Sequence, residues 1–204
     1  MDRVLLGRAN SSNVMKVIWL LEELGLTYER REVGGPFGYP AGYRDMNPNG
    51  VVPTLVEDGW ALWESNAIVR HLAHTHPTPA WPAGPRPRAI VDQWMDWQHT
   101  VLGTPQSTVF QGLVRQTPAK RDVAAIDRAF DALSRHYTTL DQQVAREGWV
   151  AGTDFTLADI ALGVHVHRWF SFDRTRPALP ALRQWYERLL TRPAYATHVA
   201  IPMT

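Results

Sequence analysis

The chain has 204 residues, a hydrophobic content of 45% and a formal net charge of +1, from 21 Lys and Arg against 20 Asp and Glu. It can bury a core in one large domain or two small ones, and it has no excess positive charge for nucleic acid or anionic membranes. The absence of cysteine excludes disulfides, thiolate metal sites and cysteine nucleophiles, so any sulfur chemistry must use a sulfur that a ligand brings. No signal peptide or membrane-spanning run is predicted, and we expect a cytoplasmic protein.

The first third of the sequence alternates short β-like runs with helical patterns. Apolar residues that follow one another predict strands, and apolar residues at a spacing of three or four predict helices. Their order is βαβ followed by ββα. The predicted elements are strands over 4–6 and 28–33, a helix over 14–24, a hairpin over 54–56 and 61–63, and a helix over 65–73.

Residues 77–87 contain five prolines and one glycine, which prevents a regular helix or central strand from running through them. We therefore predict a linker there, between an α/β domain over 1–76 and an all-α domain over 88–204. Turn residues divide the second domain into separate helical patterns. These patterns cover 88–113, 120–146, 156–170 and 178–191.

Three small polar residues separate the first strand from the first helix. Ser11, Ser12 and Asn13 are all residue types that cap helix N-termini, which is the ordinary interpretation. A hydroxyl at this point can also donate a hydrogen bond to an anion held near the positive end of the helix. Such a site would favour a bound thiolate over the thiol.

The segment 47–55 places two turn signals before a proline that opens an apolar strand. An ordinary trans proline in a turn explains this pattern. The alternative is a cis bond between Val52 and Pro53, which would turn the main-chain groups of Val52 outward to pair with a peptide-like ligand.

The segment 63–68 places Glu64 and Ser65 where the third predicted helix begins. Ser65 has the residue type of an N-cap. As a binding site, the helix N-terminus and the Ser65 hydroxyl would hold a carboxylate, and Glu64 would face an ammonium group. One amino-acid head group carries both charges.

In this order and at these distances, the three segments resemble the glutathione-binding domain of cytosolic glutathione transferases. Residues 153–161 also resemble the capping box of the family's sixth helix, with Thr156 as N-cap, Asp159 as its partner, and Phe155 and Ile160 as a hydrophobic staple. Residues 182–194 are similar to the C-terminal helix. The resemblance implies a thioredoxin-like domain over 1–76, glutathione as co-substrate, no metal, a homodimer and a role in detoxification.

The family's sulfur-activating residue corresponds to Ser11 in the serine-using classes and to Asn13 in classes with a Thr-Pro-Asn loop. We favour Ser11, because its hydroxyl donates without ionising, whereas Asn13 is suited to capping the helix. Cysteine-using chemistry is excluded because the chain has no cysteine.

By the same resemblance, Val52 with a cis Pro53 pairs with the glutathione main chain, and Glu64 with Ser65 binds the γ-glutamyl head group. Relatives often carry Lys, Arg or Gln before the Val-Pro pair, but this chain has Val51. The glycyl carboxylate therefore needs another partner, for which Tyr39, Tyr43 and Arg44 are candidates.

The second domain is expected to hold a small hydrophobic electrophile. Trp97 and Phe110 are candidate walls of its pocket, although aromatic residues in helical domains more often belong to the core. His71, His74 and His76 do not indicate a metal site, because two of them end a predicted helix, where cationic groups meet the dipole. The alternative to a transferase is a glutathione-binding carrier or regulatory module without turnover.

Overall fold

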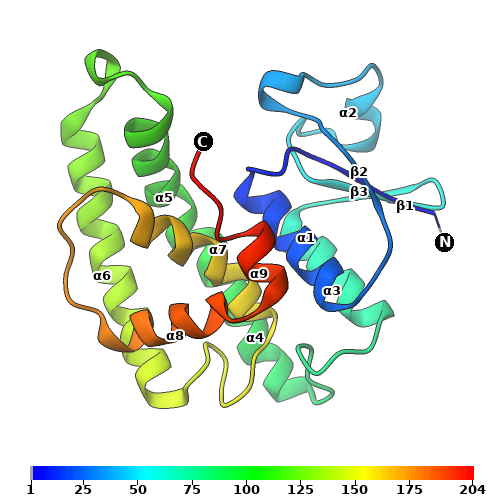
Figure 1. Ribbon diagram of the computed structural model, residues 1–204. Helices are drawn as coiled ribbons and strands as arrows, with labels where there is room; N and C mark the ends of the chain where they lie inside the picture. The colour runs from blue at the N-terminus through cyan, green and yellow to red at the C-terminus, as the bar shows by residue number, and fades with distance from the viewer. Residues whose placement is uncertain (1) are drawn as a thin grey trace.

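The computed structural model describes residues 2–204 and has a four-stranded sheet in its N-terminal domain (Figure 1). The strand order is β2-β1-β3-β4, with β1 parallel to β2 and antiparallel to β3. The βαβ–ββα order predicted from the sequence is confirmed. The regular elements are β1 (Arg3–Leu6), α1 (Ser12–Glu23), β2 (Glu29–Arg31), β3 (Thr54–Glu57), β4 (Trp60–Trp63) and α3 (Ser65–Thr75).

Two short helices between β2 and β3 were not predicted. They are the 3-10 turn η1 (Gly35–Phe37) and α2 (Tyr43–Met46). Both lie in a segment rich in glycine and proline, and four-residue helices are too short to show a hydrophobic period. This segment forms the upper edge of the N-terminal domain in Figure 1.

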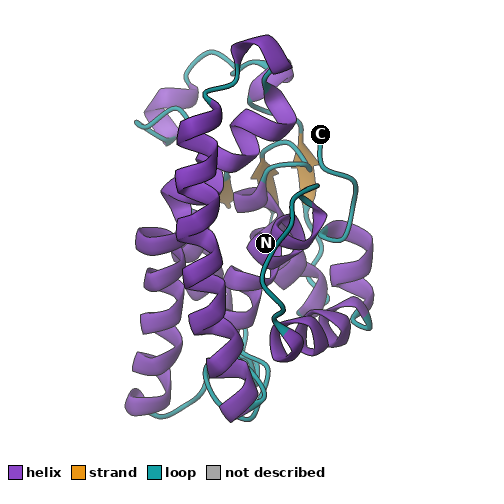
Figure 2. Ribbon diagram, turned by 90° about the vertical axis from the view of Figure 1, so that its left-hand side faces the viewer, coloured by secondary structure: helices purple, strands orange, loops and turns teal. Residues whose placement is uncertain are grey.

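The rest of the chain is all-helical, and Figure 2 shows its long helices side by side in front of the sheet. The first helical pattern, predicted over 88–113, runs continuously over 85–115 and includes two π-helical turns. It begins at Pro85, inside the predicted linker, because proline is tolerated in a first helical turn. The helices are α4 (Pro85–Trp97), η2 (Gln98–Leu102), α5 (Gly103–Phe110), η3 (Gln111–Arg115), η4 (Pro118–Lys120), α6 (Val123–Glu147), α7 (Leu157–Ser171), α8 (Pro180–Leu190) and α9 (Pro193–His198).

Helix boundaries follow the capping residues. The pattern predicted over 120–146 starts later, at α6, because the Asp122 carboxylate accepts a hydrogen bond of 2.9 Å from the Ala125 N–H and caps the helix there. The C-terminal pattern breaks before Pro193, which starts α9 as a separate helix that the sequence analysis missed.

Helix α7 is the centre of the C-terminal domain, and its residues from Leu157 to Trp169 are all buried. The predicted capping box is present at its start. The Thr156 side chain accepts a hydrogen bond from a main-chain N–H of the first turn, and the Asp159 carboxylate accepts one from the Thr156 N–H. A fully buried helix needs such an end, because its first N–H groups have no water to bind.

The two domains share one core. Trp19 of α1 packs edge-on against Tyr195 of α9 and also contacts Phe155. A Cβ on Gly163 of α7 would lie 2.9 Å from the Trp19 ring, so only glycine allows this approach. An ion pair of 2.6 Å between Arg192 and Glu23 adds a polar contact at the same interface. Within residues 2–204, no helix has both the length and the apolar character that a bilayer-spanning segment requires.

Candidate functional site

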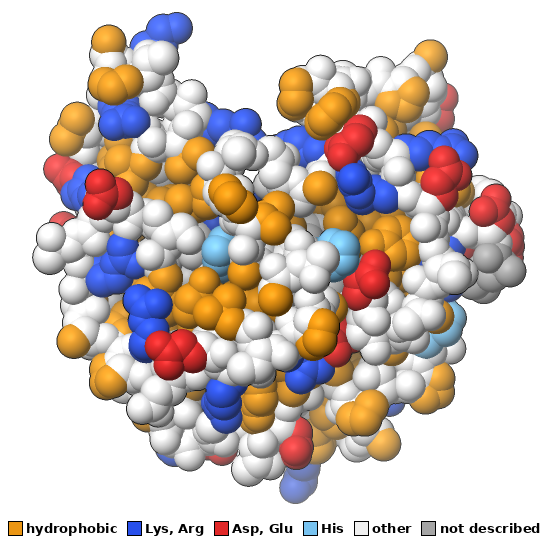
Figure 3. Space-filling model, in the orientation of Figure 1, with side chains coloured by type: hydrophobic (Ala, Val, Ile, Leu, Met, Phe, Trp, Pro, Cys, Tyr) orange, Lys and Arg blue, Asp and Glu red, His pale blue; other side chains and the backbone are white. Residues whose placement is uncertain are grey.

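A cavity of about 660 Å³ lies between the two domains. Its N-terminal wall comes from the β1–α1 loop, the first turn of α1, Tyr39, Val51 and Val52. Its other wall comes from residues 98–115 and from α7. Figure 3 shows the surface hollowed between the two lobes, with Lys or Arg atoms near the base of the hollow.

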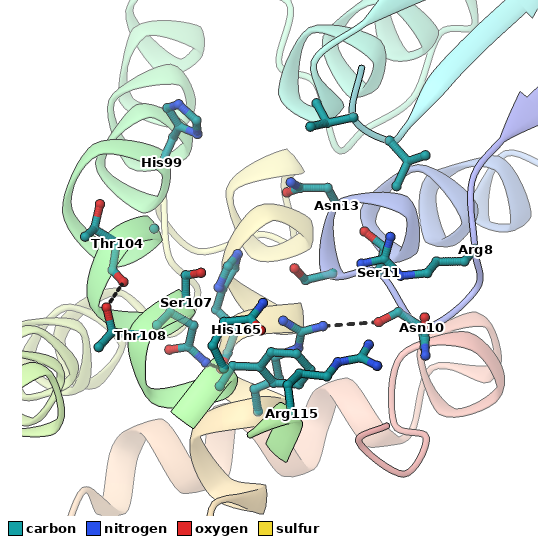
Figure 4. Close-up of a pocket in the computed structure, with 18 of the residues that line it drawn as sticks. Arg8, Asn10, Ser11, Asn13, His99, Thr104, Ser107, Thr108, Arg115 and His165 are labelled. Carbon is teal, nitrogen blue, oxygen red and sulfur yellow. Dashed lines mark hydrogen bonds between the residues drawn. The ribbon is translucent and has the colours of Figure 1, made fainter. Parts of the chain in front are cut away.

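Ser11 is the N-cap residue of α1 and lines the cavity (Figure 4). Its main-chain oxygen accepts a hydrogen bond of 2.8 Å from the Met15 N–H, but its side chain makes no capping bond within the part of the chain that the structure describes. The hydroxyl is therefore available to a ligand at the positive end of the helix.

Asn13 does not cap α1, which corrects the role expected for it. It lies inside the helix, in the first turn, and its side-chain oxygen accepts a hydrogen bond of 3.2 Å from the Ser65 hydroxyl. Asn13 also lines the cavity, so it connects the first turn of α1 to the start of α3.

The loop that carries Val52 packs closely under the start of α1. A Cβ on Gly7 would lie 2.5 Å from a methyl group of Val14 and 3.4 Å from the Val52 Cβ, so glycine is required where the three segments meet. The Val52–Pro53 peptide bond is cis, which the family resemblance implied and which the sequence motif alone left open.

Tyr43 and Asn47 hold the neighbouring carbonyl in place. The Val51 C=O accepts hydrogen bonds of 2.7 Å from the Tyr43 hydroxyl and 2.8 Å from the Asn47 amide. The main-chain N–H and C=O of Val52 are not bonded to any described residue, and Val52 lines the cavity. An unpaired donor and acceptor on one residue suit a peptide ligand.

Glu64 has a backbone conformation that is unusual for a residue with a side chain, with φ 69° and ψ 112°. Positive φ in such a residue stores strain, and strain of this kind clusters at functional sites. Ser65 follows as the first residue of α3 and is buried. Among the described residues that line the cavity, Pro53, Glu64 and Ser65 are absent. Ser65 is connected to the cavity by its hydrogen bond to Asn13, which does line it.

Of the three candidates for the glycyl carboxylate, only Tyr39 lines the cavity. Tyr43 is buried, and its hydroxyl is used by Val51 and Thr54. Arg44 donates a hydrogen bond of 3.0 Å to the Pro48 carbonyl. Its guanidinium packs against Gly50, where an added Cβ would lie 2.7 Å from the Arg44 Cζ.

The wall formed by the C-terminal domain is more polar than the sequence analysis expected. Phe110 lines the cavity, as predicted, but Trp97 is not among the lining residues and packs instead against Trp94 and His136. Helix α5 and the turn after it add hydroxyl and amide side chains. These are Thr104, Ser107, Thr108 and Gln111.

Three arginines give the cavity a positive electrostatic character. Arg8, Arg115 and Arg168 line it, and within residues 2–204 no Asp or Glu does so. Burial, with smaller contributions from the charges of Arg115 and Arg8, lowers the pKa of Arg168 to about 10. Positive charges that no lining carboxylate neutralises favour a bound anion.

A buried lysine lies behind the site. Lys16 donates hydrogen bonds of 3.2 Å to the Asn66 side chain and 3.0 Å to the Gln98 side chain, and the Gln98 amide lies 3.0 Å from the His165 ring. Burial lowers the pKa of Lys16 to about 7, although the charge of Glu64 opposes this shift.

Sequence analysis missed Lys16 and the three arginines for a physical reason. Arg8, Arg115 and Arg168 are far apart in the chain, so nothing in the local sequence shows that they meet. Lys16 is buried on the inner side of α1. From the sequence alone, a lysine in a helix is expected at the surface, because lysine is almost never fully buried.

The structure shows no group of three or more His, Asp or Glu side chains in residues 2–204 that could hold a metal ion. His71 bonds instead to the Glu57 carboxylate at 2.6 Å, and its ring lies beside that of Trp60.

Comparison with known proteins identifies the family. Residues 5–80 match the family model of the glutathione S-transferase N-terminal domain, and residues 123–188 match that of the C-terminal domain. Glutathione S-transferase GstB of Escherichia coli (strain K12) is 40% identical, over 98% of this chain and 99% of that protein. Glutathione S-transferase 3 of Zea mays is 30% identical, over 98% of this chain and 94% of the relative.

A solved structure agrees with these relatives. The theta class glutathione S-transferase of Xanthomonas axonopodis pv. citri, crystallised with glutathione bound, superimposes with a TM-score of 0.96 at 41% identity, over 100% of this chain and 99% of the other. The sequence-based resemblance and the predicted fold class are thus confirmed, and the chain belongs to the glutathione S-transferase family as an enzyme of that family.

Proposed function

We propose that the cavity binds glutathione with its cysteinyl main chain on Val52 and its sulfur at Ser11. The observation that carries this proposal is the convergence of two unused sets of hydrogen-bonding groups in one cavity. These are the Ser11 hydroxyl at the N-terminus of α1 and the main-chain N–H and C=O of Val52. The Xanthomonas relative was crystallised with glutathione bound, which supports glutathione as the ligand.

The γ-glutamyl head group of glutathione would bind where α3 begins. The first N–H groups of α3 suit its carboxylate, to which the Ser65 hydroxyl would turn from Asn13, and the exposed Glu64 suits its ammonium group. The strained backbone of Glu64 supports the same assignment, because it fixes the direction in which the helix starts.

The reaction is attack by the glutathione thiolate on a small electrophile. Ser11 donates a hydrogen bond to the sulfur, and the N-terminus of α1 favours its negative charge, so the thiol pKa falls. The S–C bond forms while the bond to the leaving group breaks, the leaving group departs with the electron pair, and the thiol proton passes to solvent. A lowering of the thiol pKa by one to two units corresponds to about 1.4–2.7 kcal/mol.

Two measurements on the purified protein test the proposal. Calorimetry with glutathione should show binding, and conjugation should be detected across a panel of aryl and alkyl halides. Binding without turnover across the whole panel would favour the alternative, a glutathione carrier or regulatory module on the same fold.

A homodimer and a cytoplasmic location remain predictions. The dimer rests on the family resemblance and on the two-fold symmetry that soluble oligomers usually adopt. A monomeric mass by light scattering at micromolar concentration would contradict it.

A further inference from the structure

The cavity has a cationic wall that the proposed contacts to glutathione leave unused. Arg8 enters it from the β1–α1 loop, Arg115 from the end of η3, and Arg168 from α7. Figure 4 shows the Arg115 side chain extending toward the loop that carries Arg8 and Asn10. Throughout residues 2–204, none of these three guanidiniums forms an ion pair with Asp or Glu.

Arg168 is fixed in place before any ligand binds. It is 9% exposed, donates a hydrogen bond of 3.2 Å to the Asn10 carbonyl, and lies 4.1 Å from the centroid of the Phe110 ring. The Arg115 guanidinium lies 5.4 Å from the same ring. Cation–π contact offsets part of the repulsion between the two arginines, but a buried guanidinium without a carboxylate remains unfavourable.

Arg8 is also held against the protein with a free hydrogen-bonding group. Its side chain packs over Gly35, where an added Cβ would lie 3.3 Å from the Arg8 Cδ. The Arg8 Nε is buried and has no hydrogen-bond partner among the described residues. A buried donor without a partner is costly, and a bound anion would satisfy it.

The other side chains of this wall are mostly polar. Thr104, Ser107 and Thr108 of α5 line it, with Gln111 beyond them. A purely hydrophobic electrophile would strip water from these groups without replacing their hydrogen bonds. A polar, negatively charged electrophile would complement both the hydroxyls and the arginines.

We propose, on the basis of the transferase function proposed above, that the second substrate is a small electrophile carrying a carboxylate. Arg115 and Arg168 bind the carboxylate, since the planar guanidinium matches the two carboxylate oxygens. The reactive carbon then faces the glutathione sulfur, where the C–S bond forms and the leaving group departs with its electron pair. The positive wall also raises the rate at which anions enter the cavity.

The test compares iodoacetate with its neutral analogue iodoacetamide. The comparison is clean in this protein because the chain has no cysteine that the reagents could alkylate. Each enzymatic rate is divided by the rate with free glutathione, which removes the difference in intrinsic reactivity. We expect the resulting enhancement to be roughly tenfold or more larger for iodoacetate, as loss of a charge-assisted hydrogen bond implies.

Three variants locate the effect. Arg115→Gln should reduce the ratio of kcat/KM for iodoacetate to that for iodoacetamide by roughly ten- to a hundredfold. Arg115→Lys keeps the charge and should retain much of the ratio. Arg128→Gln removes the same charge from an exposed position on α6, away from the cavity, and should keep the ratio of the unchanged protein.

Equal enhancement for both reagents, or equal loss for both in Arg115→Gln, would overturn the inference. A large loss of glutathione affinity in Arg115→Gln, measured by calorimetry, would also overturn it, because the arginine would then serve a glutathione carboxylate. If the unchanged protein binds no glutathione, the proposed function itself fails, and this inference fails with it.

Discussion

The Ser65 hydroxyl donates a hydrogen bond of 3.2 Å to the side-chain oxygen of Asn13. This bond connects the first turns of α1 and α3, which are the two helix N-termini of the proposed glutathione site. Asn13 is thereby oriented by Ser65, whereas the Ser11 hydroxyl has no such partner among the described residues. The structure thus shows different side-chain bonding for the two candidates for sulfur activation, of which the sequence analysis favoured Ser11.

We predict that Ser11→Ala raises the pKa of bound glutathione and lowers kcat, with little loss of glutathione binding. The reason is that a hydrogen bond to the thiolate is specific to the anion and is absent with the neutral thiol. The measurement is a pH titration of thiolate absorbance in the presence of saturating glutathione.

Asn13→Ala is the matched comparison in the same helical turn. It should leave the thiol pKa near that of the unchanged protein, because we assign the sulfur contact to Ser11, and the side-chain oxygen of Asn13 is bonded to Ser65. A raised pKa in Asn13→Ala alone would reverse the assignment. Normal values in both variants would mean that the helix terminus and main-chain N–H groups activate the sulfur by themselves.

We predict that Glu64→Ala and Ser65→Ala each weaken glutathione binding by roughly ten- to over a hundredfold, as removal of one partner of a charge-assisted hydrogen bond does. Calorimetry measures the affinity directly. Glu187→Ala, which removes an exposed carboxylate from α8, is the control and should bind glutathione normally. Unchanged affinity in both site variants would reject the placement of the γ-glutamyl group.

The motifs of the N-terminal domain could be predicted because each depends on neighbours in the sequence. Three examples are the turn before Pro53, the polar segment before α1 and the acidic residue before Ser65. Each of them is defined by residues that lie close together in the sequence. The same holds for the capping box at Thr156 and Asp159.

The other wall of the cavity could not be predicted, because it depends on how distant helices pack. Trp97 and Phe110 are both aromatic and both near the expected pocket, yet only Phe110 lines the cavity. The Arg115 and Arg168 guanidiniums lie 5.4 Å and 4.1 Å from the centroid of its ring, although more than fifty residues separate them in the sequence. Side-chain packing in three dimensions decides such contacts, and hydrophobic periodicity does not encode them.

We predict that Asp159→Ala strongly destabilises the protein, although Asp159 does not line the cavity. The buried Asp159 carboxylate accepts hydrogen bonds from the main-chain N–H groups of Val150 and Thr156, from the Thr156 hydroxyl and from the Trp185 indole. Each donor left unsatisfied costs about 1–3 kcal/mol, so the free energy of unfolding should fall by at least about 3 kcal/mol.

Urea denaturation measures this loss. Asp154→Ala, an exposed aspartate just before the helix, is the control and should change the stability by less than about 0.5 kcal/mol. A loss below about 1 kcal/mol in Asp159→Ala would show that the buried carboxylate is not the main acceptor at this helix end.

The last prediction concerns Lys16 and the pH dependence of stability. Burial lowers the pKa of Lys16 from its ordinary value of 10.5 to about 7 in the folded protein. Between these two values the unfolded chain binds more protons at this site than the folded protein does. The contribution of Lys16 to stability therefore rises as pH increases from about 7 to 10.5, and it is constant below that range.

Lys16→Met removes this titration. The stability of the unchanged protein relative to Lys16→Met should therefore increase with pH above 7, with a limiting slope of about 1.4 kcal/mol per pH unit. Urea denaturation of both proteins at several pH values from 6 to 9 gives the slope. The absolute difference at any one pH also contains the loss of the bonds to Asn66 and Gln98, so the slope is the informative quantity. Lys120→Met removes the other lysine, which is exposed, and serves as the control for the loss of a lysine. Parallel curves for the unchanged protein and Lys16→Met would mean that Lys16 keeps an ordinary pKa in the folded state.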